Sequence, residues 1–404
     1  MEDNKEIIDS PRKVKILVWL VIGIVLFRFI NFLPTMPAPI YYGIFSLFAL
    51  ITTLFKAFKL NLLILMFIIV SYLSILANDI PSYFHPYERY FGFVIIITVI
   101  GPLIQNKDLF IFRFNISKYL MIISVMITVI SFILYWVYKP ITISERGNLF
   151  CGITSHSMQM GPIAGMSFLY LVNYLFTRKN LCKINIILLV VGIVLCLLSC
   201  VLASSRAALI ATLGALMIWA LLFFNSIKKF FNFFVFFMVV VLLTSPLWWS
   251  FSESIQGKMA YSESKGSLLV TRQGLWQKNI KTFKDNPFFG SGFASMDIGR
   301  KVVKSDYKGT IEPGSGWLYI LGSCGIITFL CIVYFYIKTM IELIHIRDEN
   351  SLLLLALLSF FMIHSFAEAY ILSAGNVMFF YLWSTLGTSS LYISHKKLIK
   401  AKND

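Results

Sequence analysis

Long apolar stretches separated by short polar segments run along almost the whole chain. A helix that crosses a bilayer needs about 20 mainly apolar residues, and about twelve stretches approach that length. They are residues 14–33, 40–56, 60–78, 90–105, 118–138, 161–177, 184–203, 206–224, 230–249, 315–338, 352–372 and 377–394. Only Ser204 and Ser205 separate the seventh and eighth stretches, which form either a tight hairpin or one broken helix. The pattern predicts an all-α polytopic membrane protein with about twelve transmembrane helices.

A long polar interval, about 250–313, follows the ninth stretch. Within it, apolar residues recur at helical spacing, namely Leu275, Trp276, Ile280 and Phe283. The spacing predicts a short amphipathic helix that rests on the bundle or on the membrane surface, and Asn286 and Pro287 should end it. Gly290 and Gly292 then let the backbone pack closely or expose its amides. The expected parts of the chain are an N-terminal bundle of about nine spans, the long loop, and C-terminal transmembrane helices with a basic tail: residues 1–249, 250–313 and 314–404.

The composition also indicates a membrane protein. Of the 404 residues, 58% are hydrophobic and 13% are charged, whereas soluble domains are about half apolar and about a quarter charged. The formal net charge is +16. In a membrane protein, Lys and Arg in cytoplasmic loops explain such an excess better than nucleic-acid binding does. The six cysteines show neither metal-ligand spacing nor a disulfide framework.

The distribution of Lys and Arg predicts the orientation of the chain in the membrane. These residues concentrate in the two terminal segments and in alternate short loops, which places both termini in the cytoplasm. The long loop exceeds the length over which this charge rule acts. The short segments on the outer side contain few cations, and orientation leaves these unexplained: Arg28, Arg89, Lys139, Arg146 and Arg206.

Arg206 follows Ser204 and Ser205 at the outer start of an apolar stretch. A guanidinium at that depth is costly unless it snorkels, pairs or faces a wet cavity. It is therefore either an interface anchor or an anion clamp, in which the Ser205 hydroxyl at the helix N-terminus takes part. Arg272 heads the amphipathic helix on the same side and is either a solvated charge or a second cation for the same anion. Two converging arginines would suit a diphosphate.

Further ionisable residues lie near the outer ends of the apolar stretches: Arg146, His156, Glu312, His364 and Glu368. Three roles are open for His156: a catalytic base, a ligand contact, or a polar residue whose hydrogen bonds are made within the fold at a helix end. His364 and Glu368 are four positions apart, so a functional site and a mutual hydrogen bond both explain them. The chain contains no P-loop, nucleophile elbow, Rossmann glycine pattern or metal-binding cluster. ATP-driven and metal-dependent reactions are therefore not supported.

Four motifs, taken in order, resemble the O-antigen ligase and polymerase superfamily of bacterial surface-polysaccharide assembly. They are Gly152 to His156, Ser205-Arg206-Ala207, the long loop with Arg272, Trp276 and Asn286-Pro287-x-x-Gly290-x-Gly292, and the helix from Trp317 to Ile327. The resemblance covers about residues 140–330 closely and the whole chain in topology. It implies a GT-C-like fold in the bacterial inner membrane, with the long loop and the active site on the periplasmic face.

The resemblance also implies a glycosyltransferase that uses neither a metal nor another cofactor. Its donor would be an undecaprenyl-diphosphate-linked oligosaccharide. Arg206 and Arg272, together with Ser205 and Arg146, would bind the diphosphate and stabilise the leaving group. A second lipid-linked oligosaccharide would be the acceptor. Membrane lipid and a chain-length regulator protein are the other expected partners, and nucleic acid is not one.

Ligases of this superfamily carry His-Asn at the start of the helix after the long loop, whereas this chain has Gly314-Ser315. The difference favours polymerisation of repeat units, with Glu312 as the first candidate base and His156 or Glu368 as the others. The nearest alternative is an O-antigen ligase or a protein O-oligosaccharyltransferase that uses the same donor. A lipid-linked glycan transporter or flippase is the alternative from another class. Internal repeats with matching interrupted spans would indicate a transporter, but the features here concentrate in one loop.

Overall fold

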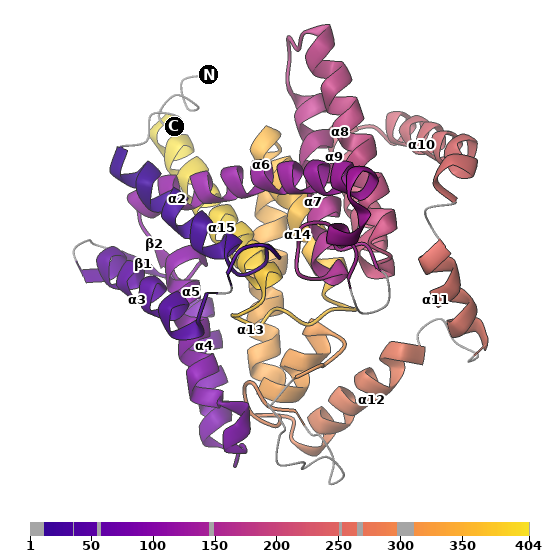
Figure 1. Cartoon of the computed structure of the whole chain (residues 1–404). Helices are drawn as coiled ribbons and strands as arrows, with labels where there is room; N and C mark the ends of the chain where they lie inside the picture. Colours follow the sequence, from indigo (N-terminus) through magenta and orange to yellow (C-terminus); the bar gives the residue numbers. More distant parts are fainter. Residues whose placement is uncertain are drawn as a thin grey trace.

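The computed structural model describes residues 12–34, 36–54, 58–144, 149–249, 253–264, 270–296 and 311–403. These residues form a helical bundle, shown in Figure 1. The helices are α2 (Arg12–Leu26), α3 (Ala38–Leu54), α4 (Leu62–Leu76), α5 (Pro86–Ile100), α6 (Lys107–Val137), α7 (Ser157–Thr177), α8 (Lys183–Leu202), α9 (Arg206–Phe224), α10 (Ile227–Trp249), α11 (Glu253–Ser264), α12 (Val270–Asp285), α13 (Gly316–Ile346), α14 (Glu349–His364) and α15 (Val377–Asn403). Short elements complete them: the 3₁₀ turns η1 (Ser82–Phe84) and η2 (Lys139–Thr142), and a two-residue antiparallel ladder of β1 (Lys59–Leu60) with β2 (Ile104–Gln105). The predicted all-α class is confirmed.

Each predicted apolar stretch overlaps a helix, from α2 for the first stretch to α15 for the last, although α2 and α14 end well before their stretches do. Within the described part of the chain, 5 helices are long and apolar enough to cross a membrane, namely α6, α8, α9, α10 and α13. Four more apolar helices, α2, α3, α4 and α14, are shorter. Apolar helices of this kind are typical of an integral membrane protein.

The two ends of the bundle differ in charge. Where α7 and α13 finish and α14 begins, Arg178 pairs with Glu349 (3.0 Å) and Lys396 pairs with Asp348 (3.3 Å). This end is called the basic end, and Figure 1 shows that α2 starts and α15 finishes on the same side. The opposite end, where α14 finishes and α15 begins, is called the site end.

The helices α8 and α9 form a hairpin, which decides between the two predicted alternatives. α8 starts just after α7 finishes at the basic end, and α9 returns there, since the Leu222 carbonyl accepts hydrogen bonds from the Arg347 side chain. Ser204 makes the turn at the site end with a left-handed backbone, φ 55°. α7 packs against both arms of the hairpin. The start of α9 is thereby fixed against the start of α7.

Arg113 has a structural role that its charge did not reveal. Its side chain is fully buried in α6 and donates to the backbone carbonyls of Thr98 (2.9 Å), Val99 (2.9 Å) and Ile104 (2.8 Å). Two of these carbonyls belong to the last turn of α5, where helical carbonyls lack intrahelical partners. Arg113 therefore caps α5 from a neighbouring helix.

The predicted amphipathic helix is α12, and it ends at Asp285 as predicted. It rests on the start of α13. The Trp276 indole N–H donates to the Gly314 carbonyl (3.1 Å), and the Asn279 amide donates to the Pro313 carbonyl (2.9 Å). These bonds attach the end of the polar loop to the bundle and set the position of α12.

The glycine-rich segment after α12 fills a break in α13. Gly325 interrupts that helix with φ 82°, and a Cβ added there would lie 2.0 Å from the Phe288 carbonyl oxygen. Backbone hydrogen bonds cross the break: the Ile326 N–H donates to the Pro287 carbonyl (2.9 Å), and the Gly292 N–H donates to the Ser323 carbonyl (2.8 Å). Of the two predicted uses of these glycines, close backbone packing is the one found, because the Gly292 amide is occupied within the fold.

Candidate functional site

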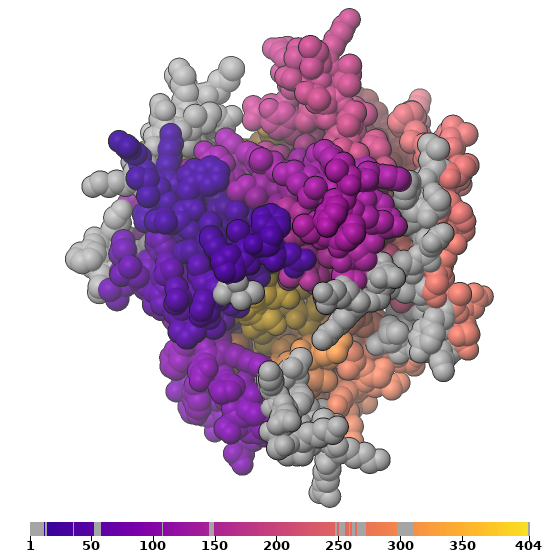
Figure 2. All heavy atoms as spheres, in the orientation of Figure 1, coloured from indigo at the N-terminus to yellow at the C-terminus, as the bar shows by residue number. Residues whose placement is uncertain are grey.

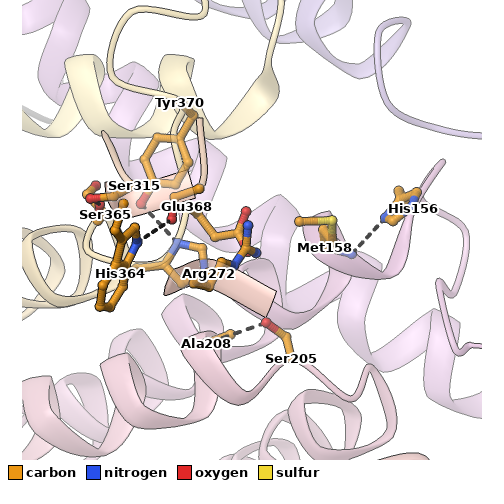
Figure 3. Close-up of polar contacts among 12 residues, drawn as sticks. His156, Met158, Ser205, Ala208, Arg272, Ser315, His364, Ser365, Glu368 and Tyr370 are labelled. Carbon is orange, nitrogen blue, oxygen red and sulfur yellow. Dashed lines mark hydrogen bonds and ion pairs between the residues drawn. The ribbon is translucent and has the colours of Figure 1, made fainter. Parts of the chain in front are cut away.

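Arg272 and Glu368 form an ion pair at the site end. Arg272 lies in the first turn of α12, and Glu368 lies in the segment between α14 and α15; their side chains are 23% and 17% exposed. The Gly316 N–H donates to the carbonyls of Ser365 (2.8 Å) and Glu368 (3.1 Å), which holds this segment on the start of α13. Figure 3 shows the pair beside His364 and Tyr370. Side chains from two distant parts of the sequence thus meet in one mostly buried site.

His364 and Tyr370 support the segment that carries Glu368. The helix α14 ends at His364, so Glu368 lies beyond it. Of the two explanations left open for His364 and Glu368, a mutual side-chain hydrogen bond is not the one found among the described residues. Instead, the Nδ1 atom of His364 lies 3.0 Å from the Tyr370 hydroxyl, and Glu368 pairs with Arg272. The α14 helix ends at His364, and each of the two side chains has a partner of its own.

Glu368 is an ionisable group whose charge changes near neutral pH. Its pKa is raised from 4.5 to about 7, chiefly because the carboxyl is buried. The neighbouring Glu312 carboxylate also raises this pKa, whereas the Arg272 guanidinium lowers it. Glu312 itself is exposed. The site therefore combines a solvated carboxylate with a buried carboxyl poised between its two protonation states, a combination suited to proton transfer.

Gly314 stands at the position of the ligase histidine, and the hydroxyl of the next residue, Ser315, is committed to the fold. It caps α13 by accepting a hydrogen bond from the Leu318 N–H (3.4 Å), and it donates to the Ser365 carbonyl (3.4 Å). A serine hydroxyl is a preferred group at this capping position. Ser315 thus orders the segment around Glu368.

His156 and Ser205 cap two adjacent helices at the site end. The Nδ1 atom of His156 accepts a hydrogen bond from the Met158 N–H (3.1 Å) at the start of α7, and the Ser205 hydroxyl accepts one from the Ala208 N–H (3.3 Å) at the start of α9. A Cβ added at Gly161 would lie 2.9 Å from the Ser205 Cβ, so the two helix starts are in contact. Their partly positive N-termini lie at the same level of the bundle.

Arg206 is the first residue of α9 and is half-buried. The packing of α9 against α14 sets the position of Arg206 along the bundle axis. A Cβ added at Gly214 would lie 2.6 Å from Ile363, the residue before His364. Arg206 precedes Gly214 by about 12 Å of helix. It therefore lies beyond the end of α14, on the side where the segment with Glu368 continues.

The structure thus places the predicted residues in two groups at the site end. One group contains Arg272, Glu368, Glu312 and Ser315, and the other contains His156, Ser205 and Arg206. Arg146 lies outside the described residues. Over the described residues, no cluster of three or more His, Cys, Asp or Glu could hold a metal ion.

Two important residues escaped the sequence reasoning. Tyr370 binds His364 only because α14 ends where it does, and no spacing in the sequence predicts that end. Gly325 breaks α13, and its signal was available: two glycines, Gly322 and Gly325, stand inside an apolar stretch. A glycine at such a position suggests a break or a close backbone approach.

Comparison with known protein families finds a match in the central part of the chain. Residues 191–333 match the O-antigen ligase family. The match confirms the predicted resemblance to the O-antigen ligase and polymerase superfamily, whose members are glycosyltransferase-like membrane enzymes acting on lipid-linked glycans. The matched region runs from the middle of α8 into α13 and contains Arg206, Arg272, Glu312 and Gly325. No curated protein matches the chain.

Proposed function

We propose that this protein is a polysaccharide polymerase of the bacterial inner membrane. It joins repeat units carried on undecaprenyl diphosphate and releases undecaprenyl diphosphate. The observation that carries the proposal is the Arg272–Glu368 pair at the site end, beside Glu312 and within a family of ligases and polymerases. The excess of Lys and Arg at the opposite end supports a cytoplasmic basic end and a periplasmic site.

In the proposed reaction, a hydroxyl of the acceptor sugar attacks the anomeric carbon of the donor. A new carbon–oxygen bond forms, the bond from that carbon to the diphosphate oxygen breaks, and the acceptor proton passes to a base. Negative charge grows on the departing diphosphate. Arg272 and Arg206 would bind it, aided by the N-termini of α7 and α9. Arginine suits this role because its planar fork can hold two phosphate oxygens at once.

Among the three candidate bases, the geometry favours Glu368 over Glu312 and His156. The pKa of Glu368 is raised to about 7, so at neutral pH a substantial fraction of the carboxyl is ionised and able to accept a proton. The carboxyl also lies beside Arg272, the cation expected to hold the leaving group. His156 caps α7 through Nδ1, which supports a positioning role for it at the start of that helix.

The residues at the α13 start support polymerisation over ligation. Gly314 stands at the position of the ligase histidine and has no side chain that could accept a proton, and the Ser315 hydroxyl beside it is bonded within the fold. The base expected of a ligase is thus absent from this position. The carboxyls of Glu368 and Glu312 remain nearby to serve an acceptor sugar.

The test is a polymerisation assay with purified protein in nanodiscs and the lipid-diphosphate-linked repeat unit as the sole substrate. We expect the wild type to make a ladder of longer lipid-linked glycans. Arg272→Ala, Arg206→Ala and Glu368→Gln should lose the ladder. Arg178→Ala is the matched control, because it removes an arginine from an ion pair at the basic end.

Other outcomes would redirect the assignment. If the donor is consumed only when lipid A-core or a protein acceptor is added, the protein is a ligase or an oligosaccharyltransferase. If the folded wild type never consumes the donor but moves it between leaflets, the protein is a transporter. A ladder that survives in Arg272→Ala and Arg206→Ala would disprove the proposed diphosphate site.

A further inference from the structure

Arg28, just after α2, presents part of its guanidinium toward exposed backbone at the site end. Its Nη1 atom donates to the Met36 carbonyl (3.2 Å), and its guanidinium carbon lies 4.9 Å from the centre of the Tyr41 ring. A Cβ added at the exposed Gly375 would lie 3.1 Å from Arg28 Nη2. None of the ion pairs found among the described residues involves Arg28. The side chain is thus oriented without a carboxylate.

Arg89 and Tyr42 lie with Arg28 in one cluster. The charges of both arginines act on the Tyr42 hydroxyl, which itself lies 3.9 Å from the Cβ position of Gly375. Arg89 comes from the first turn of α5, and the Tyr42 ring packs against Gly92 in the next turn of that helix. Two cations, one from the turn after α2 and one from α5, therefore act on one hydroxyl. These residues, Arg28, Tyr42, Arg89 and Gly375, are called the second arginine cluster.

Tyr319 adds a buried hydroxyl that the charge of Arg89 reaches. The residue is 4% exposed, and its hydroxyl has no hydrogen-bond partner within the described residues. The charge of Arg89 acts on it. Buried polar atoms nearly always have a partner. An orphan hydroxyl within reach of this charge fits a ligand that supplies the missing partner.

The second arginine cluster lies across one short segment from the Arg272–Glu368 pair. Glu368 and Gly375 belong to the same connection between α14 and α15, and a chain of that length spans at most about 25 Å. Figure 2 shows gold residues from the C-terminal part recessed between the indigo N-terminal helices and the magenta region near α7. Two cationic positions thus flank the connection at the same end of the bundle.

We infer that the second arginine cluster binds the diphosphate of the acceptor lipid, while Arg272 and Arg206 bind that of the donor. The inference rests on the proposed function. A polymerase must hold two lipid diphosphates at once, because the donor loses its diphosphate and the acceptor keeps its own. In the acceptor, the attacking hydroxyl and the diphosphate are separated by the repeat unit. The second anion site must therefore stand away from the reacting carbon, as the second arginine cluster does.

The experiment separates the acceptor from the donor. The donor is a lipid-diphosphate-linked repeat unit whose accepting hydroxyl is methylated, so that it can only donate. The acceptor is either the lipid-diphosphate-linked repeat unit or the same oligosaccharide without lipid and diphosphate. The full-length protein, in phosphatidylcholine nanodiscs, is compared with the double variant Arg28→Gln/Arg89→Gln. The matched control is Lys139→Gln, because Lys139 is an exposed cation that contacts the Tyr135 ring instead.

In the double variant we expect KM for the lipid-linked acceptor to rise about tenfold or more, since the variant removes charge-assisted contacts to phosphate. KM for the donor and transfer to the diphosphate-free acceptor should stay within about twofold of wild type. Arg28→Lys/Arg89→Lys should recover part of the affinity. An equal loss with both acceptors, no loss with either, or the same loss in Lys139→Gln would overturn the inference and leave the proposed function intact.

Two further arms distinguish the sources of phosphate and the two proposals. If the defect of the double variant appears only when phosphatidylglycerol is added to the nanodiscs, the cluster binds membrane headgroups and the inference is wrong. If wild type transfers to neither acceptor, the proposed function fails. The number of undecaprenyl diphosphate molecules bound per protein then decides: two in wild type and one in the double variant support the cluster, and equal numbers refute it.

Discussion

Gly325→Ala should destabilise the protein strongly, because the position combines strain with a backbone contact. The residue has φ 82° and ψ −179°, a combination that is essentially restricted to glycine. Imposing it on alanine costs about 1–3 kcal/mol. In addition, the new Cβ would lie 2.0 Å from the Phe288 carbonyl oxygen, so segment 287–292 must move away. The strain alone therefore sets a lower limit for the effect.

Moving that segment also breaks backbone hydrogen bonds across the α13 break. The bonds from Ile326 N–H to the Pro287 carbonyl and from Gly292 N–H to the Ser323 carbonyl are 2.9 and 2.8 Å long. Each is worth about 1 kcal/mol net. With the strain, the total loss is on the order of 4 kcal/mol. Because the same segment follows α12 directly, the position of Arg272 should shift and activity should fall with stability.

The assay is thermal unfolding of the detergent-solubilised protein, followed by tryptophan fluorescence, together with the polymerisation assay. Gly325→Ala should lower the apparent Tm by several degrees. Gly23→Ala is the matched control, because a Cβ added at this position in α2 meets nothing within 4 Å. It should leave Tm unchanged or raise it slightly, since alanine favours a helix by about 1 kcal/mol over glycine. Equal apparent Tm values for the two variants would refute a structural requirement for glycine at the α13 break.

Three further predictions concern other parts of the fold. Burial raises the pKa of Glu368 from 4.5 to about 7, so the protonated carboxyl stabilises the folded state below pH 4.5, and this contribution of up to about 3 kcal/mol is lost as the pH rises through 7. Glu368→Gln cannot titrate, so its Tm should change less between these pH values than that of the wild type. Arg113→Ala leaves three carbonyls without their donor and should cost on the order of 3 kcal/mol or more, since each buried unsatisfied acceptor costs about 1–3 kcal/mol; Arg113→Lys should recover part of this loss on thermal unfolding. Trp219→Phe removes the 2.9 Å hydrogen bond to Asn173 and should lower unfolding stability by about 1–3 kcal/mol.

The helices could be predicted from the sequence because each one is a long apolar stretch, and lipid imposes a simple length rule. The amphipathic helix α12 was also predictable, since Leu275 and Trp276 recur at helical spacing with Ile280 and Phe283, and Pro287 stops the pattern. The break at Gly325 was harder to predict, because it depends on a segment that inserts from outside the helix. Apolar periodicity records which residues avoid water, but it does not record which backbone groups exchange hydrogen bonds.

The candidate site was predictable as a set of charges and less so as a set of partners. Arg206 was identified because orientation left it unexplained, and Arg272 because it heads the amphipathic helix on the same side. The pairing of Arg272 with Glu368 could not be read from the sequence, because it depends on α14 ending at His364. His364 contacts Tyr370, and the His364–Glu368 hydrogen bond, one of the two alternatives for that pair, is not the one found. Helix ends of this kind are set by tertiary hydrogen bonds, here from Gly316 to the segment after α14.

The Arg272–Glu368 pair links substrate binding to proton transfer in the proposed mechanism. While Arg272 holds the carboxylate, it opposes the rise of the Glu368 pKa that burial causes. A diphosphate carries more negative charge than a carboxylate and can accept both arms of the guanidinium. If Arg272 turns to the donor, Glu368 loses its cation and its pKa rises further, so it becomes the stronger base at the moment when the leaving group is bound. The same exchange would discourage Glu368 from accepting a proton in an empty site, since the ion pair then stabilises the unprotonated form.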